Sequence, residues 1–344
     1  MWVEATVLAC GSRTGLDSPT TTVVGVDGGT TTTSCAADGL VVLYSAPDPA
    51  EGGFVTTLTV DTTSVYWTTV TSTLTGIDVM KASLCGGTAT TLASGQSMNP
   101  SLLAVGSTDV YWVTLEGGAD GPGQVMQVPL EGGTPTALAT KVLPTALALD
   151  AANLYWTDEA TGTVMKVPLA GGTPVPLVGS GTSGGFGSVA VDATDAYWWA
   201  NQYGLRKVPL AGGDVTTLVP DTVPIGDFWH FVLSGENLYF GADLGPYALL
   251  TVPVTGGAPT VLASGPDVVG SLAVDGTSAY WLSSSACMPG SCTGLVMKVP
   301  LGGGTPVPIA SGWPVSTDGL GGITVDATSV YWTTGNTVMK VTPK

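Results

Sequence analysis

Short apolar runs separated by turn-forming residues recur along most of the chain. In the copy that begins at Ala146, these runs are Ala146–Leu149, the segment around Tyr155-Trp156, Val164–Val167 and Pro174–Val178. Asp, Asn, Thr and Gly fill the intervals between them. Short runs bounded by turn residues and rich in β-branched and aromatic side chains are typical of β-strands. Each copy therefore predicts four strands, which we call A, B, C and D in chain order.

A Tyr-Trp pair in strand B marks seven copies of this unit. The pair stands at Tyr66-Trp67, Tyr111-Trp112, Tyr155-Trp156, Tyr197-Trp198, Tyr280-Trp281 and Tyr331-Trp332, with Tyr239-Phe240 in its place once. Successive tyrosines lie 45, 44, 42, 42, 41 and 51 residues apart, which is the period of four-stranded propeller blades. We therefore predict an all-β fold, one seven-bladed β-propeller of four-stranded antiparallel blades.

The two ends of the propeller sequence are expected to meet in one blade. The seventh copy stops at Val338–Lys344 without a strand D, and the early run Leu40–Tyr44 has no blade of its own. An unpaired sheet edge is an aggregation hazard, so this N-terminal run can supply the missing strand and close the ring. This predicts a propeller domain over residues 39–344. The Thr-, Gly- and Ser-rich residues 10–38 are predicted to be a flexible linker.

Residues that recur in every blade indicate structure rather than binding. The Tyr-Trp pairs and the Met of strand C are predicted to fill the space between blades. The Asp of the turn between strands A and B is interpreted as a turn cap, since its short acceptor side chain binds nearby backbone. Five of the nine basic residues share one position in strand C: Lys81, Lys166, Lys207, Lys298 and Lys340. With a formal net charge of −17 and no basic patch, the chain is not expected to bind nucleic acid.

The connections between strands divide into two classes. The A–B and C–D turns barely change between copies, whereas the B–C and D–A loops vary in length and sequence. Connections alternate between the two ends of a blade, so the variable loops share one face of the disc, which we call the variable-loop face. Binding residues concentrate on variable loops held by a rigid scaffold. We therefore predict any ligand site on this face.

The strongest candidate site is the stretch before the fifth copy. There Asp227-Phe228-Trp229-His230 replaces the usual short apolar strand A, and strand A is expected to line the central channel. The neighbouring B–C loops add aromatic and polar residues: Trp199, Asn201 and Tyr203 in the fourth copy, and Asp243 and Tyr247 in the fifth. Aromatic rings beside hydrogen-bonding groups suit a sugar or peptide ligand. The alternative is a purely structural role, in which His230 is hydrogen-bonded and packed among aromatic residues. Trp313 and Asp318, interpreted as part of the long loop before the seventh copy, form a weaker second candidate.

Histidine count limits the chemistry. His230 is the only histidine, so a multi-histidine zinc site is excluded and any imidazole-activated nucleophile would have to use this residue. No Asp-x-Asp-x-Asp-Gly loop occurs, although scattered oxygen ligands leave calcium open. The glycine-rich stretch Gly179–Gly185 fits both a dinucleotide-binding pattern and a nucleophile elbow, but both require a strand leading into a helix. We predict no cofactor and no metal.

The cysteines bear on the compartment. Cys287 and Cys292 bracket a Met-Pro-Gly-Ser insert between two predicted strands, where a disulfide can form under oxidising conditions. Cys85 lies in a C–D turn, and Cys35 is its remaining candidate partner, a pairing that the sequence leaves open. Cys10 follows Val7-Leu8-Ala9, which resembles the cleavage site of a bacterial lipoprotein. We therefore expect lipidation at Cys10, with residues 1–9 the remnant of a signal peptide that starts further upstream. No apolar run is long enough for a transmembrane helix.

The repeat motifs resemble known propeller families. Val-Asp-x-x-x-x-Tyr-Trp-Thr and Val-Met-Lys-Val-Pro-Leu-x-Gly-Gly-Thr-Pro are similar to repeat lipoproteins of myxobacterial type and to the YWTD-type propellers of low-density-lipoprotein-receptor ectodomains. The resemblance covers residues 55–344 and implies a propeller fold. The receptor motif is Tyr-Trp-Thr-Asp, and only the third copy of this chain keeps its Asp, as Asp158. The receptor propellers have six blades, whereas this chain has seven copies.

The sequence favours a non-catalytic binding or interaction module. We expect a monomer in the bacterial cell envelope or at its surface, either secreted or held at the membrane only through a lipid on Cys10. Its ligand is expected to be a protein or a carbohydrate bound on the variable-loop face. A first alternative is a propeller enzyme of lyase or lactonase type. Resemblance to the seven-bladed streptogramin lyases would imply a catalytic histidine and carboxylate, here His230 with Asp227 or Asp243. A second alternative is a purely structural surface lipoprotein.

Overall fold

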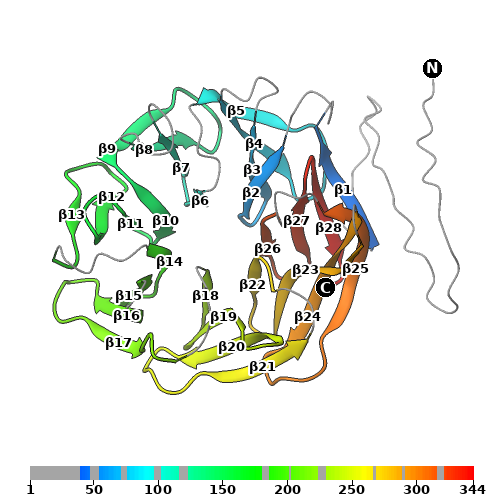
Figure 1. The fold of residues 1–344 in the computed structure, drawn as a ribbon. Coiled ribbons are helices and arrows are strands. Elements are labelled where there is room, and N and C mark those ends of the chain that lie inside the picture. The colour runs from blue at the N-terminus through cyan, green and yellow to red at the C-terminus, as the bar shows by residue number, and fades with distance from the viewer. Residues whose placement is uncertain are drawn as a thin grey trace, which may run out of the picture.

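The computed structural model describes residues 39–46, 54–70, 76–96, 102–115, 123–179, 186–200, 203–223, 230–265, 269–288, 291–315 and 321–344. Within them the chain forms seven four-stranded antiparallel sheets and no helix. Figure 1 shows the sheets arranged as blades around a central channel, with the first strand of each blade innermost. The predicted all-β, seven-bladed β-propeller is thereby confirmed.

The blades follow one another in chain order. Blade 1 contains β2 (Val55–Val60), β3 (Ser64–Val70), β4 (Ile77–Ser83) and β5 (Thr90–Gln96). Blade 2 contains β6 (Leu103–Val105), β7 (Asp109–Leu115), β8 (Gly123–Pro129) and β9 (Thr136–Val142). Blade 3 contains β10 (Pro144–Leu149), β11 (Asn153–Asp158), β12 (Thr163–Pro168) and β13 (Val175–Pro176). Blade 4 contains β14 (Phe186–Val191), β15 (Asp195–Ala200), β16 (Gly204–Pro209) and β17 (Thr216–Val219).

The remaining blades include the one that closes the ring. Blade 5 contains β18 (Phe231–Ser234), β19 (Asn237–Asp243), β20 (Tyr247–Pro253) and β21 (Thr260–Gly265). Blade 6 contains β22 (Leu272–Val274), β23 (Ser278–Met288), β24 (Ser291–Pro300) and β25 (Val307–Val315). Blade 7 contains β26 (Ile323–Val325), β27 (Val330–Thr334), β28 (Thr337–Thr342) and, as its outer strand, β1 (Gly39–Ser45).

The N-terminal strand closes the ring as predicted. β1 pairs antiparallel with β28, with Leu40 opposite Val341 and Val42 opposite Met339. Leu43 of β1 is buried in the same apolar cluster as Trp67 of blade 1, and the ring of Tyr44 lies 4.8 Å from the ring of Trp67. The strand therefore completes blade 7 and also contacts blade 1.

The Tyr-Trp pairs form the core between blades. The six Trp side chains of these pairs are at most 5% exposed. In blade 1, Trp67 belongs to a cluster shared with blade 7, whereas Tyr66 belongs to one shared with blade 2. Adjacent residues of a strand project to opposite faces of the sheet, so each pair contacts both neighbouring blades. The predicted structural role of these residues is confirmed.

The A–B turns are held by a repeated Asp–Tyr pair. In blade 3, Asp150 Oδ1 accepts hydrogen bonds from the backbone N–H groups of Ala152 and Asn153, and the Tyr155 hydroxyl donates to Asp150 Oδ2 over 2.6 Å. The same arrangement joins Asp61 to Tyr66, Asp192 to Tyr197, Asp275 to Tyr280 and Asp326 to Tyr331. These carboxylates are turn caps, as the sequence predicted.

The repeated lysine of strand C links neighbouring blades at Lys81, Lys166 and Lys340. Lys81 Nζ donates to the carbonyl oxygen of Leu130 in the next blade over 2.9 Å, and Lys166 Nζ donates to that of Leu210 over the same distance. The accepting carbonyl lies in the C–D turn, next to a pair of glycines such as Gly132-Gly133. Both glycines have φ values in the left-handed region, 85° and 152°, which favours glycine. The C–D turn keeps the same sequence in most blades for two reasons. Its backbone conformation requires glycine, and its carbonyl group accepts the lysine hydrogen bond.

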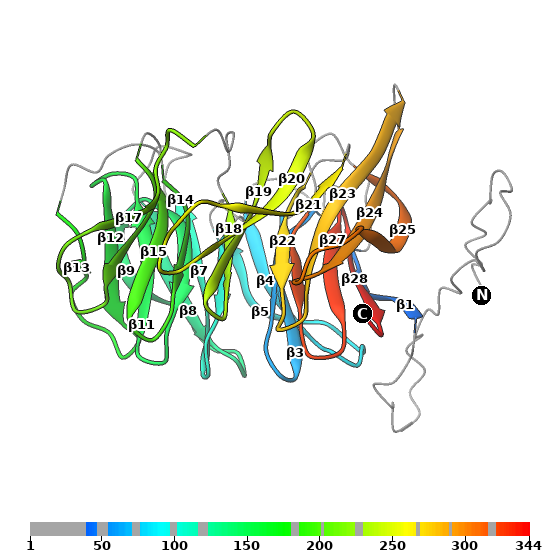
Figure 2. The ribbon, with the colours of Figure 1, turned by 90° about the horizontal axis from the view of Figure 1, so that it is seen from below.

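Two elements differ from the sequence-based assignment. Trp313 lies in β25 rather than in a loop, because β24 and β25 continue pairing as far as Cys292 opposite Val315. Figure 2 shows the long β23–β24 hairpin rising above the other blades at the variable-loop face. By contrast β13 is shorter than the predicted run Pro174–Val178.

Candidate functional site

A cavity of about 640 Å³ occupies the central channel towards the variable-loop face. The first residues of the innermost strands line it, together with the residues just before them. Its wall contains Thr56, Thr57, Thr145, Ser188 and Ser271, together with His230, Gly321 and Gly322. The hydroxyl groups of Thr56 and Thr145 are hydrogen-bonded to those of Thr68 and Thr157 on the neighbouring strands. A Cβ on Gly322 would lie 2.8 Å from Leu58, so glycine lets two blades approach closely there. The cavity therefore offers neutral hydrogen-bonding groups and one imidazole.

His230 is the most distinctive group in this wall. It precedes β18 and lies beside Ser188 of the neighbouring β14, with Nδ1 3.2 Å from Ser188 Oγ. Ser188 Oγ also accepts a hydrogen bond from the backbone N–H of Phe231 over 3.2 Å. The imidazole has solvent-accessible surface in the channel, yet the surrounding protein displaces water and lowers the pKa of His230. The ring is therefore neutral at pH 7 and can both donate and accept a hydrogen bond.

The other described candidate residues lie in separate places. Trp199 is half-buried and packs against the apolar cluster between blades 4 and 5. Tyr203 is 39% exposed in the B–C loop of blade 4. Asp243 is exposed at the end of β19 and accepts a hydrogen bond from the backbone N–H of Gly245 over 3.1 Å. None of these three lines the channel cavity beside His230.

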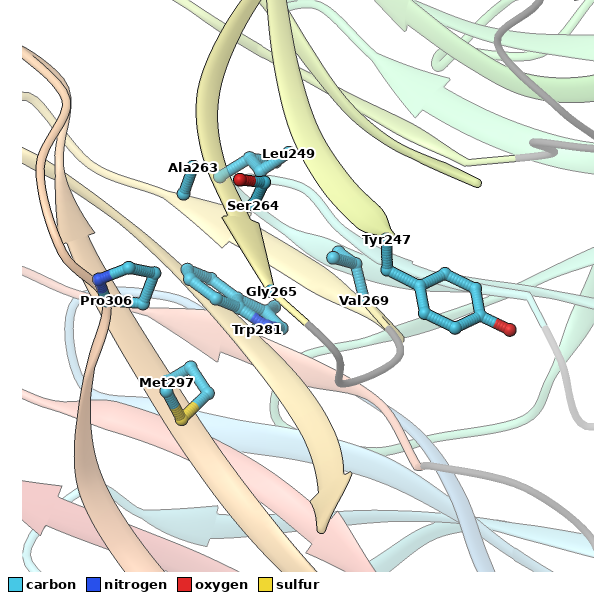
Figure 3. Close-up of a pocket in the computed structure, with 9 residues that line it drawn as sticks. All are labelled: Tyr247, Leu249, Ala263, Ser264, Gly265, Val269, Trp281, Met297 and Pro306. Carbon is cyan, nitrogen blue, oxygen red and sulfur yellow. The ribbon is translucent and has the colours of Figure 1, made fainter. Parts of the chain in front are cut away.

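Tyr247 borders a small apolar pocket between blades 5 and 6. The pocket has a volume of about 40 Å³ and is also lined by Val269, Trp281 and Met297. Figure 3 shows the Tyr247 ring pointing away from Trp281 and Met297. The space is too small for a sugar or a peptide segment, so we assign it no binding role.

Several candidate residues lie outside the described residues. These are Cys10, Cys35, Asn201, Asp227, Phe228, Trp229 and Asp318. Cys85 is disulfide-bonded, while its predicted pairing with Cys35 stays a prediction. Met288 pairs with Ser291 at the tip of the β23–β24 hairpin, which places the backbones of Cys287 and Cys292 on adjacent strands. Trp313, the other half of the second candidate, packs against Trp332 with ring centroids 5.2 Å apart.

A second and larger cavity lies on the opposite face. It has a volume of about 1240 Å³ and is formed by A–B and C–D turns of blades 7, 1 and 2, including Asp61, Gly106 and Asp326. The two carboxylates are already engaged by Tyr66 and Tyr331. The groups that line this cavity are therefore largely committed to holding the turns.

In the described part of the chain, no group of three or more His, Cys, Asp or Glu side chains is placed to hold a metal ion. No helix among the described residues is long and apolar enough to cross a membrane.

Sequence reasoning missed the small polar residues around the channel. Thr57, Thr145 and Ser271 shortly precede the apolar part of strand A, as Ser188 does. Thr57, Ser188 and Ser271 each stand four residues before the Asp of the A–B turn, and Thr145 stands five before it. This recurrence is the signal that could have identified them. Arg206 was also missed, although it is the one residue that breaks the Met-Lys pattern of strand C with a charge.

Comparison with known proteins identifies the fold. The chain matches no protein-family model and no curated protein sequence. Among solved structures, oligogalacturonate lyase from Vibrio parahaemolyticus is 11% identical over 90% of this chain and 95% of that chain, with a TM-score of 0.68. The computationally designed Ika8 protein is 12% identical over 88% of this chain and 99% of that chain, with a TM-score of 0.60. A nidogen/laminin complex is 16% identical over 61% of this chain and 81% of that chain, with a TM-score of 0.46. At such identities the likeness to the lyase and to Ika8 concerns the propeller fold alone.

Proposed function

We propose that the chain is a binding module whose ligand, a carbohydrate or a protein segment, enters the channel from the variable-loop face. The observation that carries the proposal is the uncharged channel cavity, whose wall combines apolar side chains with Ser and Thr residues and a neutral His230. Hydroxyl groups and an uncharged imidazole suit hydrogen-bonding partners without formal charge, such as sugar hydroxyls or peptide amides.

The experiment is a glycan and envelope-protein array probed with labelled wild type, His230→Ala and Trp229→Ala. We expect His230→Ala to lose the wild-type signals, and Trp229→Ala to weaken them if the ligand extends from the channel. Ser107→Ala is the matched control, because Ser107 is exposed on the opposite face. All variants should share the wild-type thermal unfolding curve. Equal signals for wild type and His230→Ala would refute a channel ligand.

A second function is favoured by the Ser188–His230 pair. A neutral imidazole 3.2 Å from a hydroxyl is an arrangement that can support proton transfer, as a lyase or lactonase requires. The carboxylate partner from the sequence prediction would be Asp227 or Asp243, and Asp243 is bonded to Gly245 instead. Turnover of lactone or acidic-oligosaccharide substrates by wild type, lost in His230→Ala, would establish the enzyme.

We further propose that the domain is exported and held at the bacterial cell envelope by a lipid on Cys10, in the manner of the repeat lipoproteins it resembles. The disulfide at Cys85 supports an oxidising compartment. Expression behind a bacterial lipoprotein signal sequence should place wild type in the detergent phase on Triton X-114 partitioning and Cys10→Ser in the aqueous phase. The same phase for both proteins would contradict a lipid anchor at this residue.

A further inference from the structure

Arg206 places a positive charge at a position that is otherwise apolar. In the other blades the equivalent residue of strand C is Met80, Met126, Met165, Leu250, Met297 or Met339. Arg206 pairs across the sheet with Trp198, and paired residues of adjacent strands project from the same face. Trp198 packs in the apolar cluster between blades 3 and 4. The guanidinium therefore belongs to this interface.

No described group neutralises this charge. Nε and Nη1 of Arg206 are buried and have no hydrogen-bond partner, whereas Lys81, Lys207 and Lys344 each lie within 4.0 Å of a carboxylate. The Trp198 indole N–H is also unpartnered, but this recurs for the tryptophans of blades 1, 2 and 7. Arg206 as a whole is half-buried, and guanidinium donors that lose hydration without gaining a hydrogen bond cost folding free energy. Methionine would avoid that cost, as the other blades demonstrate.

The surroundings of the guanidinium point to the class of ligand. The centre of the guanidinium lies 5.1 Å from the centroid of the Tyr203 ring, and Tyr203 is 39% exposed on the variable-loop face. A planar guanidinium matches the geometry of a carboxylate, and an exposed aromatic ring offers a flat apolar face to a sugar. The net charge of −17 opposes partners that carry many negative charges. A ligand that carries a single carboxylate among neutral hydroxyl groups suits the lone Arg206 cation on this negatively charged protein.

We infer that Arg206 and Tyr203 form a subsite for the carboxylate of an acidic sugar residue, at the junction of blades 3 and 4 on the variable-loop face. This inference goes beyond the proposed function, because the subsite is separate from the channel cavity and does not depend on a ligand at His230. It also accounts for a charged residue at an apolar repeat position.

The test uses the arginine side-chain signals of the whole chain. Only Arg13 and Arg206 contribute Nε–Hε resonances, and the Arg206 signal is assigned by its loss in Arg206→Met. A disaccharide with one uronic acid is titrated against a neutral disaccharide and a short acidic peptide. We expect the uronic acid to shift the Arg206 signal saturably, with the Arg13 signal and the neutral sugar as unresponsive controls. Absence of a shift, or a tighter response to the acidic peptide, would overturn the acidic-sugar subsite.

Two variants separate a binding role from a structural one. Isothermal titration should show that Arg206→Met weakens uronic acid binding by about tenfold or more, as the loss of one charge-assisted contact implies. Tyr203→Ala should weaken it by a smaller factor. The midpoint temperature of thermal unfolding should rise in Arg206→Met, since methionine serves this position in five other blades. Unchanged affinity, or a lower unfolding temperature, would show that Arg206 serves packing instead.

Discussion

Lys340 donates a hydrogen bond from Nζ to the carbonyl oxygen of Leu84 over 3.0 Å and so joins the last blade to the first. The two residues are 256 positions apart in the sequence, yet their contact repeats the one that Lys81 makes with Leu130. Lys340 is only 6% exposed, and burial lowers the pKa of its ammonium group. The seam of the ring thus uses the same lysine contact as the interior of the chain.

Replacing Lys340 by methionine should loosen the seam. We expect a loss of about 1 kcal/mol in the free energy of unfolding, as for an ordinary intramolecular hydrogen bond, measured by urea denaturation. Lys166→Met is the matched control, because Lys166 makes the same bond between blades 3 and 4. Hydrogen exchange should accelerate in the β1 amides of Lys340→Met only, since β1 is held to β28 without a covalent turn. Equal β1 protection in both variants would contradict a weak point at the seam.

Asp158 should be the most costly single carboxylate to remove. It is 2% exposed, and its oxygens accept hydrogen bonds from Trp156 Nε1, the Leu143 N–H, and the Thr161 N–H and hydroxyl. Asp158→Ala leaves buried donors unsatisfied, so we expect a loss of roughly 3 kcal/mol or more in the free energy of unfolding. Thr114→Ala, at the equivalent position of blade 2, should cost less than half as much. Similar losses in the two variants would show that the Asp158 bonds add little.

Much of the fold could be predicted because the residues that pack between blades recur at a regular spacing in the sequence. A Tyr-Trp pair placed every forty-odd residues specifies which side chains lie between blades, and the missing strand D after Lys340 specifies which segment must return to pair with β28. Trp313 was misplaced because its strand pairs beyond the usual blade length, a tertiary effect of the long β23–β24 hairpin that the repeat period does not encode.

The candidate site was less predictable, because it depends on distances between blades. The sequence placed His230 at the channel, but the Ser188 contact joins residues 42 positions apart. The repeat pattern predicts that Tyr203 and Tyr247 share the variable-loop face with His230. Tyr203 lies in blade 4 and Tyr247 in blade 5, and both are away from the channel axis. A repeat pattern specifies where a residue lies along its strand. It does not specify which residues of other blades it contacts, because those contacts depend on how the blades pack.

Acid should destabilise the propeller through the A–B turn caps. Burial opposes ionisation of Asp150, but hydrogen bonds from Tyr155, Ala152 and Asn153 outweigh it and hold the pKa of Asp150 below its usual value. A lowered carboxyl pKa means that the unfolded chain binds protons first, so stability is full above about pH 4 and falls as pH drops further. Asp61, Asp192, Asp275 and Asp326 show the same direction.

Urea denaturation between pH 2 and pH 7 checks this dependence. Asp150→Asn should lose stability at neutral pH and show a shallower acid dependence than wild type. Asp214→Asn is the control, because Asp214 is exposed. An acid dependence that is identical in Asp150→Asn and wild type would show that the turn caps do not set it.

His230 should give a separate transition in mildly acidic solution. Burial lowers the pKa of His230, so its proton binds to the unfolded chain at higher pH than to the folded chain. The free energy of unfolding should therefore fall as pH decreases from about 6.5, before the aspartate transition begins. Because His230 is the only histidine, no other side chain with an ordinary pKa titrates in this window. His230→Gln keeps a hydrogen-bonding side chain and should abolish this first transition while retaining the second. If the decline near pH 6 persists in His230→Gln, the proton uptake that causes it does not occur at His230.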